Sequence, residues 1–526
     1  MMQVYTPNKN FGFKNDYKIK LKKPPIVTQP KNLIILIETF EPDEQIIVPI
    51  RLNYEYNYNW SSSEDGQQNH TRQISTTFKE LGIHEIEISG IFPAFDYSLF
   101  SDARKNLRDI KQFGDIKFQT FETAFYGCTN LIGNFSDTPN LSECISLQGI
   151  FQNCTDFNAD LSNWDVSTIN DLSFAFENCT NFTSDLSNWN VLNLQSLQHT
   201  FFNCTNFNSD LSRWNTRYLN NLENTFYDAI NFNSDLSKWN TQNVFTLSGT
   251  FYNCSKFNSL LNDWDVSNVR YLDSTFERCS IFNSPLTAWN TSRVTTLKRT
   301  FKQSDFNQDI NDWDVSNVTD LDSTFRQASD FNKPLNLWDI SKVTTLRNTF
   351  FQAYAFNQPL NVWNISNVVN LYGTLYQTNY NHQLSNWDTS NVTTMENLFG
   401  YGKFNKSIAN WNTSKVQSFF AMFNRAFDTQ EAYNIDLFDI SNCIKFGEMF
   451  NDVTMDTSIY DSILVNWNKT LNEKYPDLTA SGYPATTVTF DAGNSKYSSG
   501  FNTAPQEAKN NLITKFKWTI TDGGTN

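Results

Sequence analysis

Apolar and polar positions follow a fixed long period between residues 151 and 450. With tryptophan taken as position 0, aromatic side chains recur at −7, Leu or Ile at −3, an aliphatic residue at +5, and Phe at +12, where Leu375 is the one exception. Tryptophan itself recurs every 24 or 25 residues, at Trp164, Trp189, Trp214, Trp239, Trp264, Trp289, Trp313, Trp338, Trp363, Trp387 and Trp411. Such a period is typical of a solenoid, in which each unit packs only against its neighbours.

The offsets within one unit predict its local structure. Positions −3, 0 and +2 combine apolar and β-branched residues, which favours a short strand that pairs in parallel with the next unit about 4.8 Å away. Positions +5, +8 and +12 are spaced by three and four residues, which favours one or two helical turns. We therefore predict an α/β solenoid, a right-handed leucine-rich-repeat-like array of units of 24 or 25 residues with parallel strands and inward-facing Trp, Phe and Leu ladders.

Two polar positions recur beside the apolar ones. Asn follows the aromatic residue at −6 in every unit except the one with Thr183, as in Asn158, Asn208, Asn233 and Asn258. We predict a structural role, in which the amide satisfies backbone groups at a turn. Asp or Asn stands at +1 and is predicted to accept backbone N–H groups. The free exchange of Asp and Asn argues against a calcium ladder, so no metal is expected.

The pattern changes on both sides of the array. Residues 33–95 alternate between apolar and polar types and predict a small antiparallel β-sandwich. Residues 96–150 read as entry repeats without Trp, residues 151–450 as the solenoid, and residues 451–526 as a C-terminal cap with helices near 461–471 and 507–517. Residues 1–32 are rich in Lys and Pro and predict a basic arm or linker.

Composition limits what the chain binds and where it acts. The net charge of −15 argues against general nucleic-acid binding. No apolar run is long enough for membrane insertion, and the first thirteen residues contain no recognisable secretory signal. Either a signal was removed, or the protein reaches a surface by another route, such as assembly into a virus particle. We therefore expect a cell-surface, extracellular or virion-surface location.

The cysteines follow the repeat instead of forming a separate framework. Five of them precede a Trp by ten residues: Cys154, Cys179, Cys204, Cys254 and Cys279. At the same place other units carry Ala229, Ala328 and Ala353. A position that accepts Cys or Ala is a small buried position, so we predict free thiols and no disulfides.

The unit from Phe306 to Phe325, FNQDINDWDVSNVTDLDSTF, resembles the repeats of BspA-type leucine-rich-repeat surface proteins of bacteria. Residues 33–95 resemble the PKD-like β domain that precedes such repeats, and residues 488–499 and 518–524 resemble their C-terminal cap. The resemblance implies a curved solenoid that acts in adhesion or recognition at a surface. Because related sequences also occur in viruses of aquatic bacteria and protists, a virion-surface protein is the alternative that the resemblance leaves open.

No catalytic motif is recognisable in the sequence. The four histidines, His70, His84, His199 and His382, are far apart, and no phosphate-binding loop, zinc-protease motif or nucleophile elbow is present. We therefore predict that the protein is not an enzyme and needs no cofactor.

Binding is then expected where the units differ, because the constant positions are needed for packing. The most variable stretch follows Trp and carries exposed-type aromatic and basic residues: Tyr218, Phe245, Arg270, Tyr271, Arg293, Lys298 and Arg299. Such residues are common at binding hot spots. The first hypothesis is a surface adhesion protein that binds a cell-surface glycan or protein through these turns. The alternative is a structural or host-attachment component of a virus particle that contacts neighbouring virion proteins through residues 1–32. A merely solvated, variable face is also compatible with this pattern.

Overall fold

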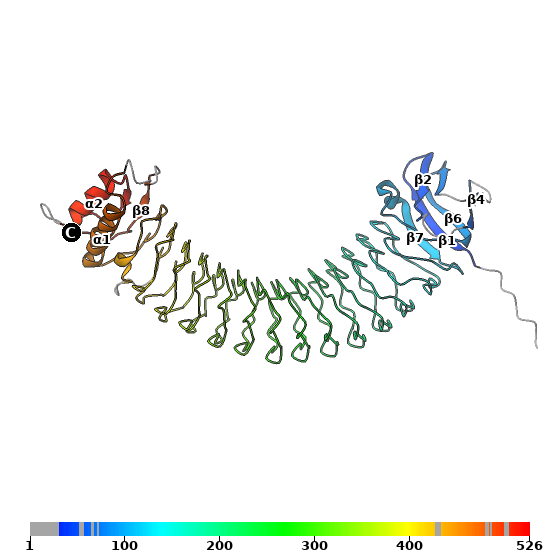
Figure 1. The fold of residues 1–526 in the computed structure, drawn as a ribbon. Helices are drawn as coiled ribbons and strands as arrows, with labels where there is room; N and C mark the ends of the chain where they lie inside the picture. The colour runs from blue at the N-terminus through cyan, green and yellow to red at the C-terminus, as the bar shows by residue number, and fades with distance from the viewer. Residues whose placement is uncertain are drawn as a thin grey trace, which may run out of the picture.

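The structure is a computed structural model that describes residues 31–51, 57–64, 68–70, 73–426, 433–478, 483, 487–498 and 504–526. The predicted basic arm lies outside these ranges except for its last two residues. A long curved repeat array joins a small β module at the N-terminal end to a helical module at the C-terminal end (Figure 1).

The N-terminal module contains two antiparallel sheets. The larger sheet has the strand order β4 (Gln68–His70), β3 (Asn57–Ser62), β6 (Gly82–Ile91), β1 (Leu33–Thr39) and β7 (Leu107–Gln112). The smaller sheet pairs β2 (Glu44–Val48) with β5 (Ile74–Phe78). Alternate residues of β1 are fully buried, as the sequence pattern predicts. The sheet extends past the predicted boundary at residue 95, because the 3-10 helix η1 (Ser101–Asn106) leads into its edge strand β7.

The repeat array pairs successive units through single residues. Parallel bridges join the residues at position +7, from Asp171 and Ser196 through Thr394 and Ser418. The predicted strand around each Trp and the predicted helical turns from +5 to +12 are wrong. Between residues 113 and 426, all of which the structure describes, it has turns and single bridges but no strand or helix.

The backbone between positions +7 and +14, which we term the ladder segment, explains the absence of helices. Phe174 at +10 and Asn178 at +14 have φ values of 60° and 62°, in the left-handed region. A left-handed residue every fourth position prevents a right-handed helix from continuing. The N–H groups of Phe174 and Asn178 instead donate to Gln198 O and Phe202 O of the next unit, at 2.9 and 2.8 Å. Hydrogen bonds that would run along a helix therefore run between units.

The core of the array consists of stacked aromatic ladders, and all eleven repeat tryptophans are buried. The rings of Trp189 and Trp214 are 6.4 Å apart and inclined by 3°. From Trp189 onward each indole Nε1 donates to the carbonyl at −3 of the preceding unit, as in the 2.8 Å bond from Trp189 to Leu161 O. The Trp side chains of the ladder are therefore held both by ring stacking and by hydrogen bonds to backbone carbonyl groups.

The recurring polar residues make hydrogen bonds to the backbone. Asn233 Oδ1 accepts the N–H of Asn258 at 2.9 Å, and Asn258 Oδ1 accepts the N–H of Asn283 at 3.0 Å, so −6 amides satisfy the same position of the next unit. At +1, Asp265 Oδ1 accepts the N–H of Ser267 at 2.9 Å within its own turn. All eight cysteines are free and buried, which confirms the prediction of free thiols.

The array curves because its two sides are joined differently. Ladder segments are linked by direct backbone hydrogen bonds, and the stacked rings of Tyr227 and Tyr252 at +13 are only 4.0 Å apart. On the Trp side the links pass through side chains, and Trp239 and Trp264 are 6.4 Å apart. Closer spacing along the ladder segments than along the Trp ladder bends the array toward the ladder segments, and Figure 1 shows the resulting arc.

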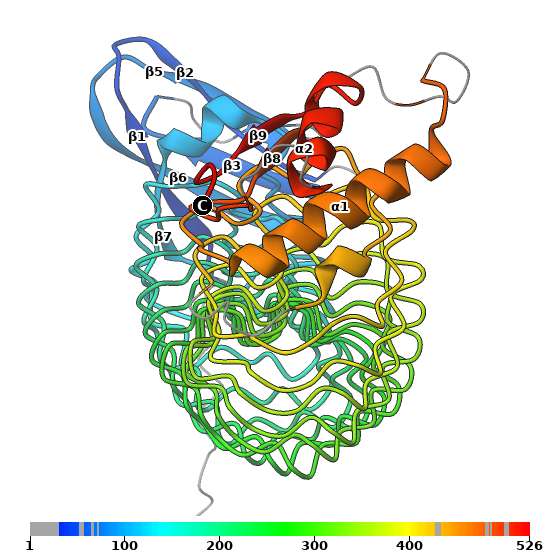
Figure 2. The ribbon, with the colours of Figure 1, turned by 90° about the vertical axis from the view of Figure 1, so that its left-hand side faces the viewer.

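Both ends of the array are covered. At the N-terminal end Arg51 reaches Asp96 Oδ2 at 3.0 Å and donates to Glu122 O at 3.1 Å. At the C-terminal end α1 (Thr457–Lys474) and α2 (Ala504–Thr514) lie beside η2 (Ile435–Leu437) and a parallel pair of strands, β8 (Thr489–Asp491) and β9 (Thr519–Thr521). Figure 2, along the array, shows the β module and the helices on the same side of the stacked units. No helix of the described residues is long and apolar enough to cross a membrane.

Candidate functional site

Four of the seven residues predicted for binding line one hollow on the surface of the array. Phe245, Arg270, Tyr271 and Arg293 surround it together with Asn243 and Asn268, and its volume is about 410 Å³. We term it the turn hollow. Tyr218 does not line it and is covered by the guanidinium of Arg217, 4.7 Å from its ring centre. Lys298 and Arg299 also lie elsewhere, in a ladder segment at +9 and +10.

The asparagines at +4 build the floor of the turn. Asn243 Nδ2 donates to Arg217 O at 2.9 Å, and Asn268 Nδ2 donates to Gln242 O at 2.7 Å. Arg293 occupies the same position in the next unit, and its Nη1 donates to Asn268 Oδ1 at 2.5 Å. The row of +4 Asn side chains is therefore followed by the guanidinium group of Arg293, which lines the hollow.

Arg270 and Phe245 occupy position +6, where side chains point outward. The backbone at this position is hydrogen-bonded between units, with Arg270 N donating to Phe245 O and Thr295 N donating to Arg270 O, both at 2.9 Å. The Arg270 side chain has no hydrogen bond or salt bridge to any residue in the described part of the chain. Phe245 and Tyr271 are each 42% exposed. The turn hollow therefore presents one unpaired guanidinium group and two accessible rings.

An acidic side chain of the adjoining ladder segment, Asp273, is already hydrogen-bonded. Thr296 Oγ1 donates to Asp273 Oδ1 at 2.7 Å. Burial raises the pKa of Asp273 above its ordinary value, an effect that this hydrogen bond only partly offsets. Arg270 and Arg293 make no ion pair with it or with any other carboxylate among the described residues. In a chain of net charge −15, this gives the turn hollow a local positive character.

A hollow of similar shape recurs near the C-terminal end of the array. It has a volume of about 440 Å³ and is lined by Thr393, Lys415, Gln417, Asn442 and Ile444. Lys415 at +4 donates to Asn391 Oδ1 at 2.7 Å, as Arg293 does to Asn268. The surface between successive turns is therefore hollowed in more than one place, and the turn hollow differs in its two guanidinium groups and two rings.

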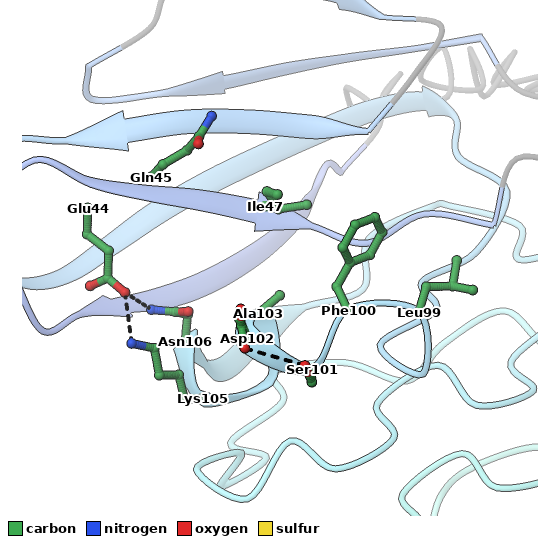
Figure 3. A pocket seen from close by; sticks show the side chains of 10 residues that line it. All are labelled: Glu44, Gln45, Ile47, Leu99, Phe100, Ser101, Asp102, Ala103, Lys105 and Asn106. Atoms are coloured by element: carbon green, nitrogen blue, oxygen red, sulfur yellow. Dashed lines mark hydrogen bonds and ion pairs between the residues drawn. The ribbon is translucent and has the colours of Figure 1, made fainter.

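A third hollow, of about 320 Å³, lies in the N-terminal module between β2 and η1 (Figure 3). Its acidic group, Glu44, accepts hydrogen bonds from Asn106 at 2.9 Å and Phe40 N at 2.6 Å, and pairs with Lys105 at 3.3 Å. Burial alone would raise the pKa of Glu44, but these bonds lower it below its ordinary value. Because Glu44 holds η1 against the sheet, we assign this hollow a structural role.

The histidines do not form a catalytic group in the described part of the chain. His199 stacks between Phe174 and Phe202, with ring centres 4.9 and 5.1 Å away, and burial lowers its pKa. His382 Nε2 lies 2.9 Å from Asn357 O. No cluster of three or more metal-binding side chains occurs among the described residues.

The chain matches a family model described as "Mycoplasma protein of unknown function, DUF285" over residues 97–212, 195–305, 271–382 and 375–467. These overlapping matches run through the whole array. The chain belongs to this family. The 25-residue period and its aromatic positions are therefore those of a DUF285 repeat array, and the turn hollow lies inside the matched region. No protein of known annotation matches the chain.

The inner face of this DUF285 array carries features that the sequence interpretation missed. Rings at +10 and +13 form a stripe along the ladder segments: Phe174, His199, Phe202, Tyr227 and Tyr252. Amides at +14 form a parallel ladder, as in the 3.0 Å bond from Asn203 to Asn178. The available signal was recurrence of Phe or Tyr at +13, as in Phe202, Tyr227 and Tyr252, and of Asn or Gln at +14. At +10 only Phe174 and His199 carry a ring. Because these rings stack on one another, they stabilise the array.

Proposed function

We propose that this DUF285 protein is a non-enzymatic recognition protein that binds a cell-surface glycan or protein through the turn hollow. The supporting observation is the convergence of Arg270, Arg293, Phe245 and Tyr271 on one hollow. Other units hold Thr at +6 and Asn at +4, as in Thr319 and Asn317, so the array does not need these residues for packing. Arg and aromatic residues are frequent among residues that dominate binding energy.

We further propose that the array is a leucine-rich-repeat solenoid of the BspA type and that the protein acts at a cell or particle surface. Stacking of like positions in successive units and the curvature of the array support this interpretation. The alternative function, as a structural or host-attachment component of a virus particle, depends on residues 1–32, of which residues 1–30 lie outside the described part of the chain.

The function is tested by binding of the purified protein to glycan arrays and to intact cells. The informative variant is Arg270→Thr with Arg293→Asn, which restores the residues of the neighbouring units and leaves the backbone ladders intact. We expect it to lose about tenfold or more in affinity, as a hot-spot change would. The matched control is Lys342→Asn, because Lys342 also stands at +4 and donates to a preceding Asn, but outside the hollow. Unchanged binding by the double variant, or no binding by the natural protein, would contradict the proposal.

A further inference from the structure

We infer that the turn hollow takes the carboxylate-bearing sugar of a linear acidic glycan, an inference that rests on the function proposed above. It names the ligand's chemistry, which neither the family description nor the repeat pattern supplies.

Most of the guanidinium donors in the hollow are unused. A guanidinium group has five N–H donors in a planar fork. Arg293 uses Nη1 for the neutral Asn268, and Arg270 makes no side-chain hydrogen bond to any described residue. Thr295 N donates to Arg270 O at 2.9 Å, so the two arginines come from adjoining turns. Such planar forks bind carboxylates through two parallel hydrogen bonds.

The remaining lining suits a sugar ring. Neither Phe245 nor Tyr271 stacks on another ring in the part of the chain that the structure describes, unlike the rings of the ladder segments. Their faces are therefore accessible to the C–H groups of a sugar. Asn243 Nδ2 is bonded to Arg217 O, while its Oδ1 has no donor among the described residues and can accept a hydroxyl. The volume of about 410 Å³ falls in the range of about 300–1,000 Å³ typical of small-ligand sites.

Other anionic ligands fit the surroundings less well. An extended acidic peptide would add a strand to a free backbone edge. At this face the edge is already occupied, because Phe245 N donates to Asn220 O at 3.0 Å and Arg270 N to Phe245 O at 2.9 Å. Nucleic acid requires a wide basic surface, whereas the chain has a net charge of −15. A glycan with spaced carboxylates needs only the local pair of arginines.

The test compares two probes of equal length by isothermal titration calorimetry with the full chain. Hyaluronan hexasaccharide carries a carboxylate on alternate sugars, and chitin hexasaccharide carries none. We expect hyaluronan hexasaccharide to bind at least about tenfold more tightly, because charge-assisted hydrogen bonds are roughly twice as strong as neutral ones. Equal binding of the two probes would overturn the inference. A chondroitin sulfate hexasaccharide distinguishes the anion, since binding of the sulfated probe alone would also overturn it.

Two double variants and one control variant separate carboxylate recognition from general charge attraction. Arg270→Thr with Arg293→Asn is expected to lose about tenfold in affinity for hyaluronan hexasaccharide, and Lys342→Asn is expected to keep it. Arg270→Lys with Arg293→Lys keeps both charges but loses the planar forks, so it is expected to bind several-fold more weakly than the natural protein. Wild-type affinity in the double Lys variant would overturn the inference. If cells are bound through the hollow but hyaluronan hexasaccharide is not, the inference fails and the proposed function stands.

Discussion

At the scale of single residues, the constant positions of the repeat combine two functions. Trp264 is almost fully buried, stacks on Trp239 at 6.4 Å, and donates through Nε1 to Leu236 O at 2.9 Å. Replacement of the ring would therefore leave a cavity and remove one of the two hydrogen bonds that Leu236 O accepts, the other coming from Trp239 N at 3.1 Å.

We predict that Trp264→Ala lowers the free energy of unfolding by about 3–5 kcal/mol, the cost typical of deleting a buried aromatic side chain. Urea unfolding followed by circular dichroism measures the change. Tyr218→Ala serves as the control, because Tyr218 is 45% exposed, and a change within about 0.5 kcal/mol is expected there. A loss below about 1 kcal/mol for Trp264→Ala would show that the Trp ladder contributes little.

At the scale of the ladder segment, left-handed residues set the conformation of the unit. Asn253 at +14 has φ 55°, and its Nδ2 donates to Asp228 Oδ1 at 2.7 Å. Both Asn253→Gly and Asn253→Val remove this hydrogen bond. The difference in unfolding free energy between the two variants therefore reports the cost of the left-handed backbone conformation. A β-branched residue in the left-handed region costs about 1–2 kcal/mol, whereas glycine adopts it freely.

We therefore predict that the Val variant at position 253 is less stable than the Gly variant by about 1–2 kcal/mol. This order is opposite to the one expected in an ordinary strand, where valine is favoured over glycine. Paired urea-unfolding curves of the two variants provide the measurement. Greater stability of the Val variant would mean that position 253 does not hold a left-handed conformation in solution.

The sequence predicts which residues are buried better than it predicts the backbone that buries them. Trp264 and Phe276 recur at constant positions, and constancy of large apolar residues is sufficient to indicate a core. The left-handed positions carry a weaker signal, because residues that favour positive φ, such as Asn178 and Gly249, alternate there with residues that do not. Phe174, Arg299 and Gln327 all adopt positive φ there, although none of these residue types favours it. The prediction of helical turns was wrong because the sequence did not indicate these left-handed residues.

The binding surface was predictable in part. Arg270 and Arg293 were singled out because they depart from the repeat, and the structure brings them to one hollow. Lys298 and Arg299 follow Arg293 closely in sequence but lie beyond the fully buried Leu297. Lys298 and Arg299 do not line the hollow. Proximity in sequence therefore does not indicate a shared surface within a unit this small.

At the scale of the whole molecule, the buried thiols couple stability to pH. Burial raises the pKa of Cys144 and of Cys443 to about 12, and raises those of the other cysteines above their ordinary value of 9.0. In the unfolded chain the thiols ionise near the ordinary value, while the folded state keeps them protonated. The thiols therefore destabilise the folded state as pH rises from about 9 toward 12.

We predict that the urea midpoint of unfolding falls between pH 8 and pH 10.5, and that Cys204→Ala makes this fall smaller. Alanine is a suitable replacement because Ala229 occupies the same place in the next unit and is equally buried. Buried tyrosines such as Tyr380, whose pKa is also raised by burial, contribute to the same fall in both proteins. Identical pH profiles of the variant and the natural protein would contradict the prediction.

The direct hydrogen bonds between ladder segments also give the array an electrical direction. Along the ladder, N–H groups of one unit donate to carbonyl groups of the following unit, as Phe174 N does to Gln198 O. Peptide dipoles aligned in this way add together, as they do along an α-helix and unlike those of ordinary sheets. The N-terminal end of the ladder then carries the negative pole and unmet acceptors, and the C-terminal end carries the positive pole and unmet donors. Arg51 donates to Glu122 O at the first end, and Asp491 O accepts Phe450 N at the second. The two end modules are therefore matched to opposite poles, and exchanging them would leave like charges facing each other at both ends.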